Sequence, residues 1–201
     1  MADKYQTVMS ADLHGKNRKL LFDSIKNFSF PNNIVVDPYE RMIFFVSNYA
    51  IYTSDLSGEN VTMVLLEGNY PGEVGRGVRC VALDRANRKL YFSGRNFEEA
   101  DTMFYLARAN YDGSEVEDFN TTGVGDVYSM EVLGDTLYFA QHTEEVCHDE
   151  VLSVKTTSRE RFTPRKIFVP SLCKSNMWGI KVLHPCVQRH PNDKYCSDFY
   201  I

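Results

Sequence analysis

The sequence predicts an all-β protein whose units are the four-stranded blades of a β-propeller. The same order of short apolar runs returns along the 201-residue chain, with Asp37 and Asp84 lying 47 residues apart and Tyr91 and Tyr138 separated by the same distance. Each unit holds four strand-like runs that are divided by turn residues. Phenylalanine and tyrosine occur 13 and 12 times against a single tryptophan, and both of these aromatic residues favour strands.

Three full units and two partial ones follow in order. The chain opens with a partial blade at residues 8–22, which matches only the third and fourth runs. Full blades follow at about 31–70, 77–122 and 127–170, and a last strand covers 178–184. A four-stranded repeat of this length indicates a propeller, because a single sheet cannot bury both faces but neighbouring blades bury them against each other. The alternative is a set of unrelated hairpins packed as a β-sandwich.

A few residue types recur at fixed places in the units and predict structural roles. In the first two full units an aspartate ends the first run and a glycine marks the turn between the third and fourth runs, where a positive φ is needed, and in all three units an aromatic pair lies in the second run. The first run is the most apolar, as expected for a strand that lines a crowded centre. The recurring positions are Asp37, Phe44, Phe45, Asp55, Gly58, Asp84, Tyr91, Phe92, Gly113, Tyr138 and Phe139.

Composition and charge exclude several classes of protein. Hydrophobic residues make up 43% of the chain and charged residues 24%, which is the mixture of a globular protein rather than of a disordered, collagen-like or coiled-coil one. The net charge of −5 makes nucleic acid an unexpected partner. The longest apolar stretch, residues 42–46, is too short to cross a membrane, and the N-terminus is unlike a signal peptide. Membrane attachment is therefore expected only through a transmembrane segment outside this chain.

Two motifs and the C-terminal tail carry a family likeness. Asp37 and Pro38 precede the aromatic pair of the first full unit, and residues 53–60 read Thr-Ser-Asp-Leu-Ser-Gly-Glu-Asn. These features resemble the class B (Tyr-Trp-Thr-Asp) repeats of the low-density lipoprotein receptor family. Residues 179–196 resemble the last propeller strand of that family running into the first cysteine of an epidermal-growth-factor-like module. The signature tetrapeptide differs, because the aromatic pair is kept without the tryptophan and the final aspartate.

The resemblance implies a six-bladed propeller, of which this chain is the C-terminal part. Residues 1–185 would form the partial propeller, and residues 186–201 the start of an epidermal-growth-factor-like module or a C-terminal tail. The implied function is a non-catalytic, extracellular protein-binding module of an endocytic receptor or co-receptor, at the outer side of the plasma membrane or secreted. The implied partners are protein ligands or adjacent receptor modules. No cofactor is expected here, and calcium would be held by neighbouring modules.

Two other functions stay open. A basement-membrane or growth-factor-precursor propeller would share the same repeats. A calcium-dependent propeller hydrolase would place carboxylates at the inner ends of several blades, where Asp37 and Asp84 occupy equivalent positions. The competing interpretation is that each aspartate caps the turn after its strand. Neither a Gly-x-Ser-x-Gly elbow nor a His-Glu-x-x-His helix occurs in the sequence, so no nucleophile–base pair is predicted.

Five cysteines, four of them in the last 55 residues, indicate a local disulfide region. Cys147 and Cys173 flank the outer strands of one unit, and a disulfide between them would close a loop of about 25 residues and add roughly 3 kcal/mol. Cys186 and Cys196 either form a second disulfide or stay free, and the family resemblance makes Cys196 the first cysteine of a further module. Cys80, on an inner strand, is predicted to be a buried thiol. Three sequons predict N-glycosylation, at Asn27, Asn60 and Asn120.

Four further clusters favour structural roles over functional sites. Residues 144–150 combine carboxylates, a thiol and an imidazole that could hold a metal, but a solvated hairpin tip is the preferred interpretation. His184 and His190 lie near two cysteines without a Cys-x-x-Cys knuckle, which disfavours zinc. The glycines of residues 72–77 lead into a strand rather than a helix, which favours a loop between blades over a phosphate site. A small basic group, expected as a solvated face with an acidic partner as the alternative, consists of Lys16, Arg18 and Lys19.

Overall fold

Three four-stranded antiparallel sheets and one two-stranded sheet make up the described part of the protein. The structure is a computed structural model that describes residues 7–23, 33–65, 76–96, 103–119, 124–143, 148–157 and 164–168. Every regular element within these ranges is a strand, which confirms the all-β prediction. No helix in the described ranges is long and apolar enough to cross a membrane.

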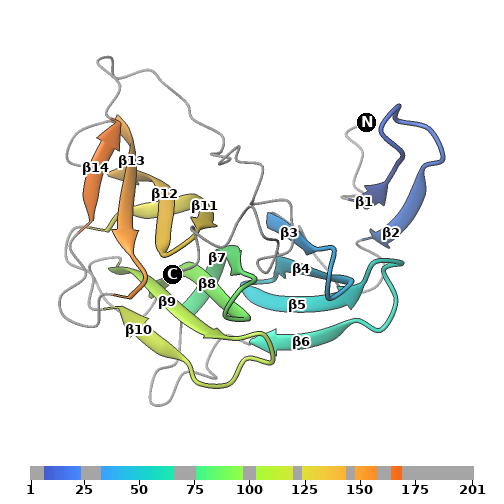
Figure 1. Ribbon diagram of the computed structural model, residues 1–201, viewed down its shortest axis with the longest axis horizontal. Helices are drawn as coiled ribbons and strands as arrows, with labels where there is room; N and C mark the ends of the chain where they lie inside the picture. Colours follow the sequence, from blue (N-terminus) through green and yellow to red (C-terminus); the bar gives the residue numbers. More distant parts are fainter. Residues whose placement is uncertain are drawn as a thin grey trace.

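The strands of each sheet follow one another in chain order (Figure 1). The two-stranded sheet consists of β1 (Thr7–Ser10) and β2 (Lys19–Asp23). The first blade consists of β3 (Asn33–Asp37), β4 (Met42–Ser47), β5 (Ala50–Asp55) and β6 (Thr62–Leu65). The second blade consists of β7 (Arg76–Asp84), β8 (Lys89–Asn96), β9 (Met103–Asn110) and β10 (Glu117–Phe119). The third blade consists of β11 (Asp126–Leu133), β12 (Thr136–Thr143), β13 (His148–Lys155) and β14 (Arg165–Phe168).

The first strands of the three blades meet near the centre of the molecule. β7 packs against both β3 and β11, each of which is the first strand of its own sheet. Figure 1 shows the sheets fanning out from this region, with β6, β10 and β14 on the outside. Four-stranded meanders that converge on their first strands are the blades of a β-propeller. The described sheets therefore form part of a propeller, as the repeats predict.

Hydrophobic clusters fill the spaces between successive sheets. Each cluster takes its side chains from two neighbouring sheets, so that neither sheet could bury this apolar surface alone. Removal of apolar surface from water is the main stabilising contribution, at about 25 cal/mol per Å². The clusters are centred on aromatic rings, with Phe22 and Phe45 in the first, Phe44 and Phe92 in the second, and Tyr91 and Phe139 in the third.

In the first blade, the recurring aromatic pair contacts both neighbouring sheets. Successive residues of a strand point to opposite faces of the sheet. Phe45 stacks on Phe22 of the preceding sheet with ring centroids 4.5 Å apart. Phe44 lies 4.8 Å from the ring of Tyr111 in the following blade. The pair thus packs this blade against the sheets on both sides.

Burial of the apolar residues in the first strands differs between blades. β7 packs between β3 and β11, and its Val81 is fully buried. On β3, by contrast, Ile34 and Val36 expose 38% and 40% of their surface. The apolar side chains of β3 are therefore less covered than those of β7. Contacts with the first strands of other blades, which β7 makes with both β3 and β11, accompany this burial and are not reported by apolar composition.

The outer hairpins of the two-stranded sheet and of the first two blades close with the same turn. In each, a glycine N–H donates to the carbonyl oxygen three residues earlier, and each glycine has a positive φ. A Cβ on Gly58 would lie 2.8 Å from the backbone oxygen of Leu21, and one on Gly113 would lie 2.2 Å from that of Val64. Both contacts are with the outer strand of the preceding sheet. Glycine is therefore needed here both for its φ and for the close approach of two blades.

Candidate functional site

A cavity of about 530 Å³ lies between the second and third blades, and we refer to it as the inter-blade pocket. It is bordered by the turn after β7, by side chains of β8, β9 and β10, and by the turn after β13. Its volume falls within the range of about 300–1,000 Å³ that is typical of ligand pockets. The lining is largely polar and consists of Asp84, Asn87, Lys89, Tyr91, Arg108, Glu115, Glu117, Thr156 and Thr157.

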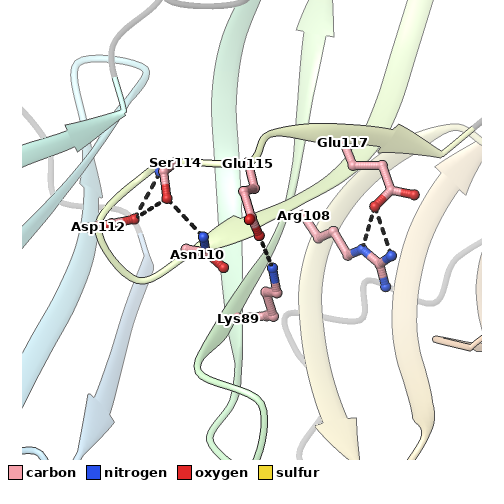
Figure 2. Close-up of polar contacts among 7 residues, drawn as sticks. All are labelled: Lys89, Arg108, Asn110, Asp112, Ser114, Glu115 and Glu117. Carbon is pink, nitrogen blue, oxygen red and sulfur yellow. Dashed lines mark hydrogen bonds and ion pairs between the residues drawn. The ribbon is translucent and has the colours of Figure 1, made fainter.

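Arg108 on β9 connects the two blades at one wall of the pocket. Its Nε and Nη2 both donate to Oε2 of Glu117, at 3.0 and 2.7 Å, as Figure 2 shows. Its Nη1 donates to the backbone oxygen of Thr156 in the third blade at 3.2 Å. Burial lowers the pKa of Arg108, but hydrogen bonds to Glu117 and Tyr91 outweigh this effect and raise the pKa above its usual value. The guanidinium therefore stays charged and is held in place.

A second ion pair borders the pocket beside the turn that follows β9. The Nζ of Lys89 lies 2.9 Å from Oε2 of Glu115, and this hydrogen bond holds the pKa of Glu115 below its usual value. In the same turn, Asn110 Nδ2 donates to Ser114 Oγ at 2.7 Å, and Ser114 Oγ donates to Oδ1 of Asp112 at 2.6 Å. Figure 2 shows these contacts side by side. Both cations of this wall thus already have carboxylate partners.

Aromatic rings lie behind the charged wall. The ring of Tyr91 is nearly parallel to that of Phe119, with centroids 5.9 Å apart and an interplanar angle of 7°. The Cζ of Arg108 lies 5.6 Å from the centroid of Phe119, within cation–π distance. Burial raises the pKa of Tyr91, so its hydroxyl is protonated at neutral pH. The pocket therefore combines an aromatic side with paired charges.

Asp84 borders the pocket and caps the turn after β7. Its Oδ1 accepts the backbone N–H of Asn87 at 3.1 Å, and its Oδ2 accepts the Nδ2 of the same residue at 2.9 Å. Asp37 caps the equivalent turn after β3, where Oδ1 accepts the N–H groups of Tyr39 and Glu40 at 3.0 and 3.1 Å. Both aspartates are almost fully buried. Each carboxylate thus stabilises its own turn.

The two blade interfaces differ at the residue that follows the third strand. This residue is Tyr111 after β9 and Thr156 after β13. Both donate their backbone N–H to the carbonyl oxygen of the residue just before the second strand of their own sheet, so the two positions are equivalent. Tyr111 reaches into the first interface and donates its hydroxyl to Oδ2 of Asp37 at 2.9 Å. Thr156 is shorter, and the inter-blade pocket lies between it and Asp84.

The motif residues of the turn after β5 form one hydrogen-bonded unit. The Oδ1 of Asp55 accepts the backbone N–H groups of Ser57 and Glu59 at 2.8 and 3.0 Å. Its Oδ2 accepts the Nδ2 of Asn60 at 2.9 Å. The Ser57 hydroxyl also donates to Oδ1 of Asp55. Together these hydrogen bonds lower the pKa of Asp55 to about 2, and the largest contribution comes from the Ser57 hydroxyl. Asn60, one of the predicted glycosylation sites, is exposed and has a φ of 53°. Because its amide donates to Asp55, this side chain also stabilises the turn.

Cys80 is buried on β7 as a free thiol, as predicted. Its Sγ lies 3.0 Å from Oγ of Ser93, and burial raises its pKa to about 12, which leaves the thiol unreactive. Within the described ranges, no group of three His, Cys, Asp or Glu side chains is placed to hold a metal ion. Lys16, Arg18 and Lys19 are exposed around the β1–β2 turn.

Several predicted sites fall outside the described residues and stay predictions. The domain boundary at residues 185–186 is among them, as are the last strand at 178–184 and residues 144–147 of the acidic cluster. The same holds for most of the glycine-rich loop at 72–77. The individual side chains concerned are Asn27, Asn120, Cys147, Cys173, His184, Cys186, His190 and Cys196.

Sequence reasoning does not single out the inter-blade pocket. Of its lining, only Asp84 and Tyr91 belong to the recurring motif positions. A signal is nevertheless present in the residue that follows the third run of each unit, which is Leu56, Tyr111 or Thr156. Alignment of the units on their third runs brings out this change from large to small side chain.

Comparison with known proteins bears on the fold. No protein-family model and no curated protein matches the sequence. A chain of a nidogen/laminin complex has a TM-score of 0.61 and 12% identity, covering 84% of this chain and 59% of that one. A gluconolactonase from Xanthomonas campestris has a TM-score of 0.56 and 19% identity, covering 80% and 57%. A protein described as TolB from Agrobacterium tumefaciens has a TM-score of 0.53 and 16% identity, and the match covers 82% of this chain and 62% of that one.

These similarities concern the fold alone, because all three identities lie below 20%. This chain spans less than two thirds of the length of each of the three proteins. The three differ from one another in described function, and a shared fold does not carry a function with it.

Proposed function

We propose that this chain is a non-catalytic, extracellular protein-binding module of an endocytic receptor or co-receptor, of the type found in the low-density lipoprotein receptor family. A propeller is a rigid scaffold whose faces and loops present side chains to protein ligands or to adjacent receptor modules. Calcium, where the whole protein needs it, is held by neighbouring modules.

The observation that carries this proposal is the use of the two equivalent carboxylates. Calcium takes about 6–8 oxygen ligands around one ion. Asp37 instead binds its own turn and the hydroxyl of Tyr111, while Asp84 binds its own turn at a different blade interface. These two carboxylates are thus engaged in turn capping and blade packing rather than directed at one common ion. This supports a binding role over a calcium-dependent hydrolase.

The likeness to a chain of a nidogen/laminin complex supports a protein partner. The described complex contains two proteins, so this propeller architecture occurs in an assembly of proteins. The same likeness favours, as the alternative, a basement-membrane or growth-factor-precursor propeller. The likeness to a gluconolactonase favours the hydrolase as the alternative from another class.

Two assays on the secreted chain distinguish these functions. Biolayer interferometry on the immobilised chain measures binding of low-density lipoprotein particles and of laminin, with and without a calcium chelator. Saturable binding of one of these probes that persists in chelator, with no hydrolysis of glucono-δ-lactone, is expected. Calcium-dependent hydrolysis of the lactone without saturable binding of either probe would overturn the proposal.

The extracellular location has its own test on the same preparation. Peptide mapping under non-reducing conditions is expected to find Cys147 joined to Cys173, and glycan mapping to find modified sequons among Asn27, Asn60 and Asn120. A chain purified from secreting cells with both cysteines as free thiols and no glycan would contradict an extracellular location.

A further inference from the structure

The two described interfaces between full blades share a buried aspartate at the end of a first strand but differ in the side chains around it. In the first, the ring of Tyr111 packs against Phe44 at 4.8 Å and its hydroxyl binds Asp37. In the second, Asp84 stands where Asp37 stands, but Thr156 replaces the tyrosine and a cavity of about 530 Å³ remains. The second interface therefore has the equivalent carboxylate but no tyrosine at the position of Tyr111, while its own Tyr91 lies at the position of Phe44.

We propose that the inter-blade pocket receives a tyrosine side chain of a protein partner, with the phenol hydroxyl donated to the carboxylate of Asp84. The partner's ring would take the place that Tyr111 occupies at the neighbouring interface. This inference rests on the proposed protein-binding function and names the side chain that the pocket recognises.

Asp84 has the capacity for such a hydrogen bond. An ionised carboxylate offers about four lone-pair sites. The described hydrogen bonds to Asp84 come from the backbone N–H and the side-chain amide of Asn87. Asp37 accepts three hydrogen bonds at once, two from backbone N–H groups and one from a phenol hydroxyl, and a phenol on Asp84 would bring that carboxylate to the same number. A hydroxyl donated to a carboxylate is also among the stronger hydrogen bonds.

The walls of the pocket favour a neutral ligand. Lys89 and Arg108 are paired with Glu115 and Glu117, so an anionic group such as a phosphotyrosine would have to displace an existing carboxylate. A cationic side chain would likewise compete with these cations for their partners. A neutral tyrosine leaves both ion pairs intact and places its ring beside Tyr91, which lines the pocket.

Binding of two small probes tests the recognition directly. The probes are N-acetyl-tyrosinamide and N-acetyl-phenylalaninamide, titrated into the full isotope-labelled chain and followed by amide chemical shifts. The tyrosine probe is expected to shift signals around Asp84 and Thr156 and to bind at least about tenfold more tightly than the phenylalanine probe, which lacks the hydroxyl. Equal binding of both probes, or binding of neither, would overturn the inference.

A pair of variants supplies the control. Thr156→Tyr introduces the side chain of the first interface and is expected to abolish binding of the tyrosine probe. Leu56→Tyr introduces the same side chain at the equivalent position of the first blade, away from the pocket, and is expected to leave the probe affinity within about twofold. Unchanged probe binding by Thr156→Tyr would place the site elsewhere and overturn the inference.

Failure of this inference is separable from failure of the proposed function. Binding of lipoprotein particles or laminin that is the same for the wild-type chain and for Thr156→Tyr would retain protein binding and reject the pocket as its site. If the wild-type chain binds neither lipoprotein particles nor laminin, the proposed function itself is rejected.

Discussion

The hydroxyl of Tyr111 donates a hydrogen bond of 2.9 Å to Oδ2 of Asp37, joining the outer hairpin of the second blade to the inner turn of the first. Both residues are buried, with 6% and 1% of their surfaces exposed. The bond therefore fixes the relative position of two sheets that are otherwise held mainly by apolar contacts. It also gives the buried carboxylate at the end of β3 a partner beyond its own turn.

Removal of this hydroxyl is expected to destabilise the protein. Tyr111→Phe keeps the ring and leaves Asp37 without one of its donors, so the free energy of unfolding should fall by about 1.5–3 kcal/mol. Urea denaturation measures the change. Tyr138→Phe, at the half-buried aromatic position of the third blade, is the matched control and should change stability by less than about 0.5 kcal/mol. Equal effects of the two variants would contradict the role given to the Tyr111 hydroxyl.

The same tyrosine predicts a loss of stability in alkali. Burial, and then the charge of Asp37, raise the pKa of Tyr111 above its ordinary value of 10.0. Because the pKa is raised in the folded state, the contribution of protonated Tyr111 to the free energy of unfolding is complete below pH 10 and is lost as the pH rises above 10. Stability measured at pH about 8 and about 11 should therefore fall less in Tyr111→Phe than in the wild type. An identical fall would show that Tyr111 does not carry the effect.

Asp55 predicts a loss of stability in acid. The hydrogen bond from Ser57 and the others in the turn lower its pKa from 3.8 to about 2. A lowered pKa gives a contribution that is present above pH 3.8 and is lost as the pH falls toward 2. Carbon-detected NMR titration should find the Asp55 carboxyl at about 2, and in Ser57→Ala the pKa should move upward. An Asp55 pKa at its ordinary value would contradict the turn geometry.

Two glycines in equivalent turns should respond differently to alanine. Gly15 has a φ of 72° and nothing within 4 Å of an added Cβ, so Gly15→Ala is expected to cost only about 1–2 kcal/mol of backbone strain. Gly113 has a φ of 82°, and its Cβ would meet the backbone oxygen of Val64 at 2.2 Å. Gly113→Ala should therefore lower stability by at least about 1 kcal/mol more. Equal losses would mean that the second blade does not press on β6.

The structural and glycosylation roles of Asn60 can be separated with two variants. Asn60→Gln and Thr62→Ala both destroy the sequon, but only the first removes the amide that donates to Asp55. Mass spectrometry of the secreted chain should find no glycan at this sequon in either variant. The melting temperature of material produced in bacteria, which carries no glycan, should fall further in Asn60→Gln. A larger fall in Thr62→Ala would contradict the structural role of the amide.

The repeated pattern made the fold predictable from the sequence. Phe44 and Phe45 recur as Tyr91 and Phe92, and adjacent strand residues must face opposite neighbours, so the pattern itself indicates stacked sheets. The turn around Gly58 was predictable for the same reason, because only certain residues accept its backbone conformation. Local rules therefore account for the blades.

The inter-blade pocket was not predictable in this way. Its walls join Arg108 of one blade to the backbone of Thr156 in another, 48 positions along the chain. Nothing local to Arg108 reports that a neighbouring blade carries a threonine where a tyrosine would fill the space. The exposure of Ile34 on β3 has the same origin, because packing between blades is a property of two units and not of one.

Selection of peptides from a random displayed library on the immobilised chain tests protein binding at the inter-blade pocket most directly. The wild-type chain is expected to enrich peptides that share a tyrosine, and Thr156→Tyr is expected to lose them. Absence of enrichment on the wild-type chain, or retention of the same peptides by the variant, would contradict protein binding at this pocket.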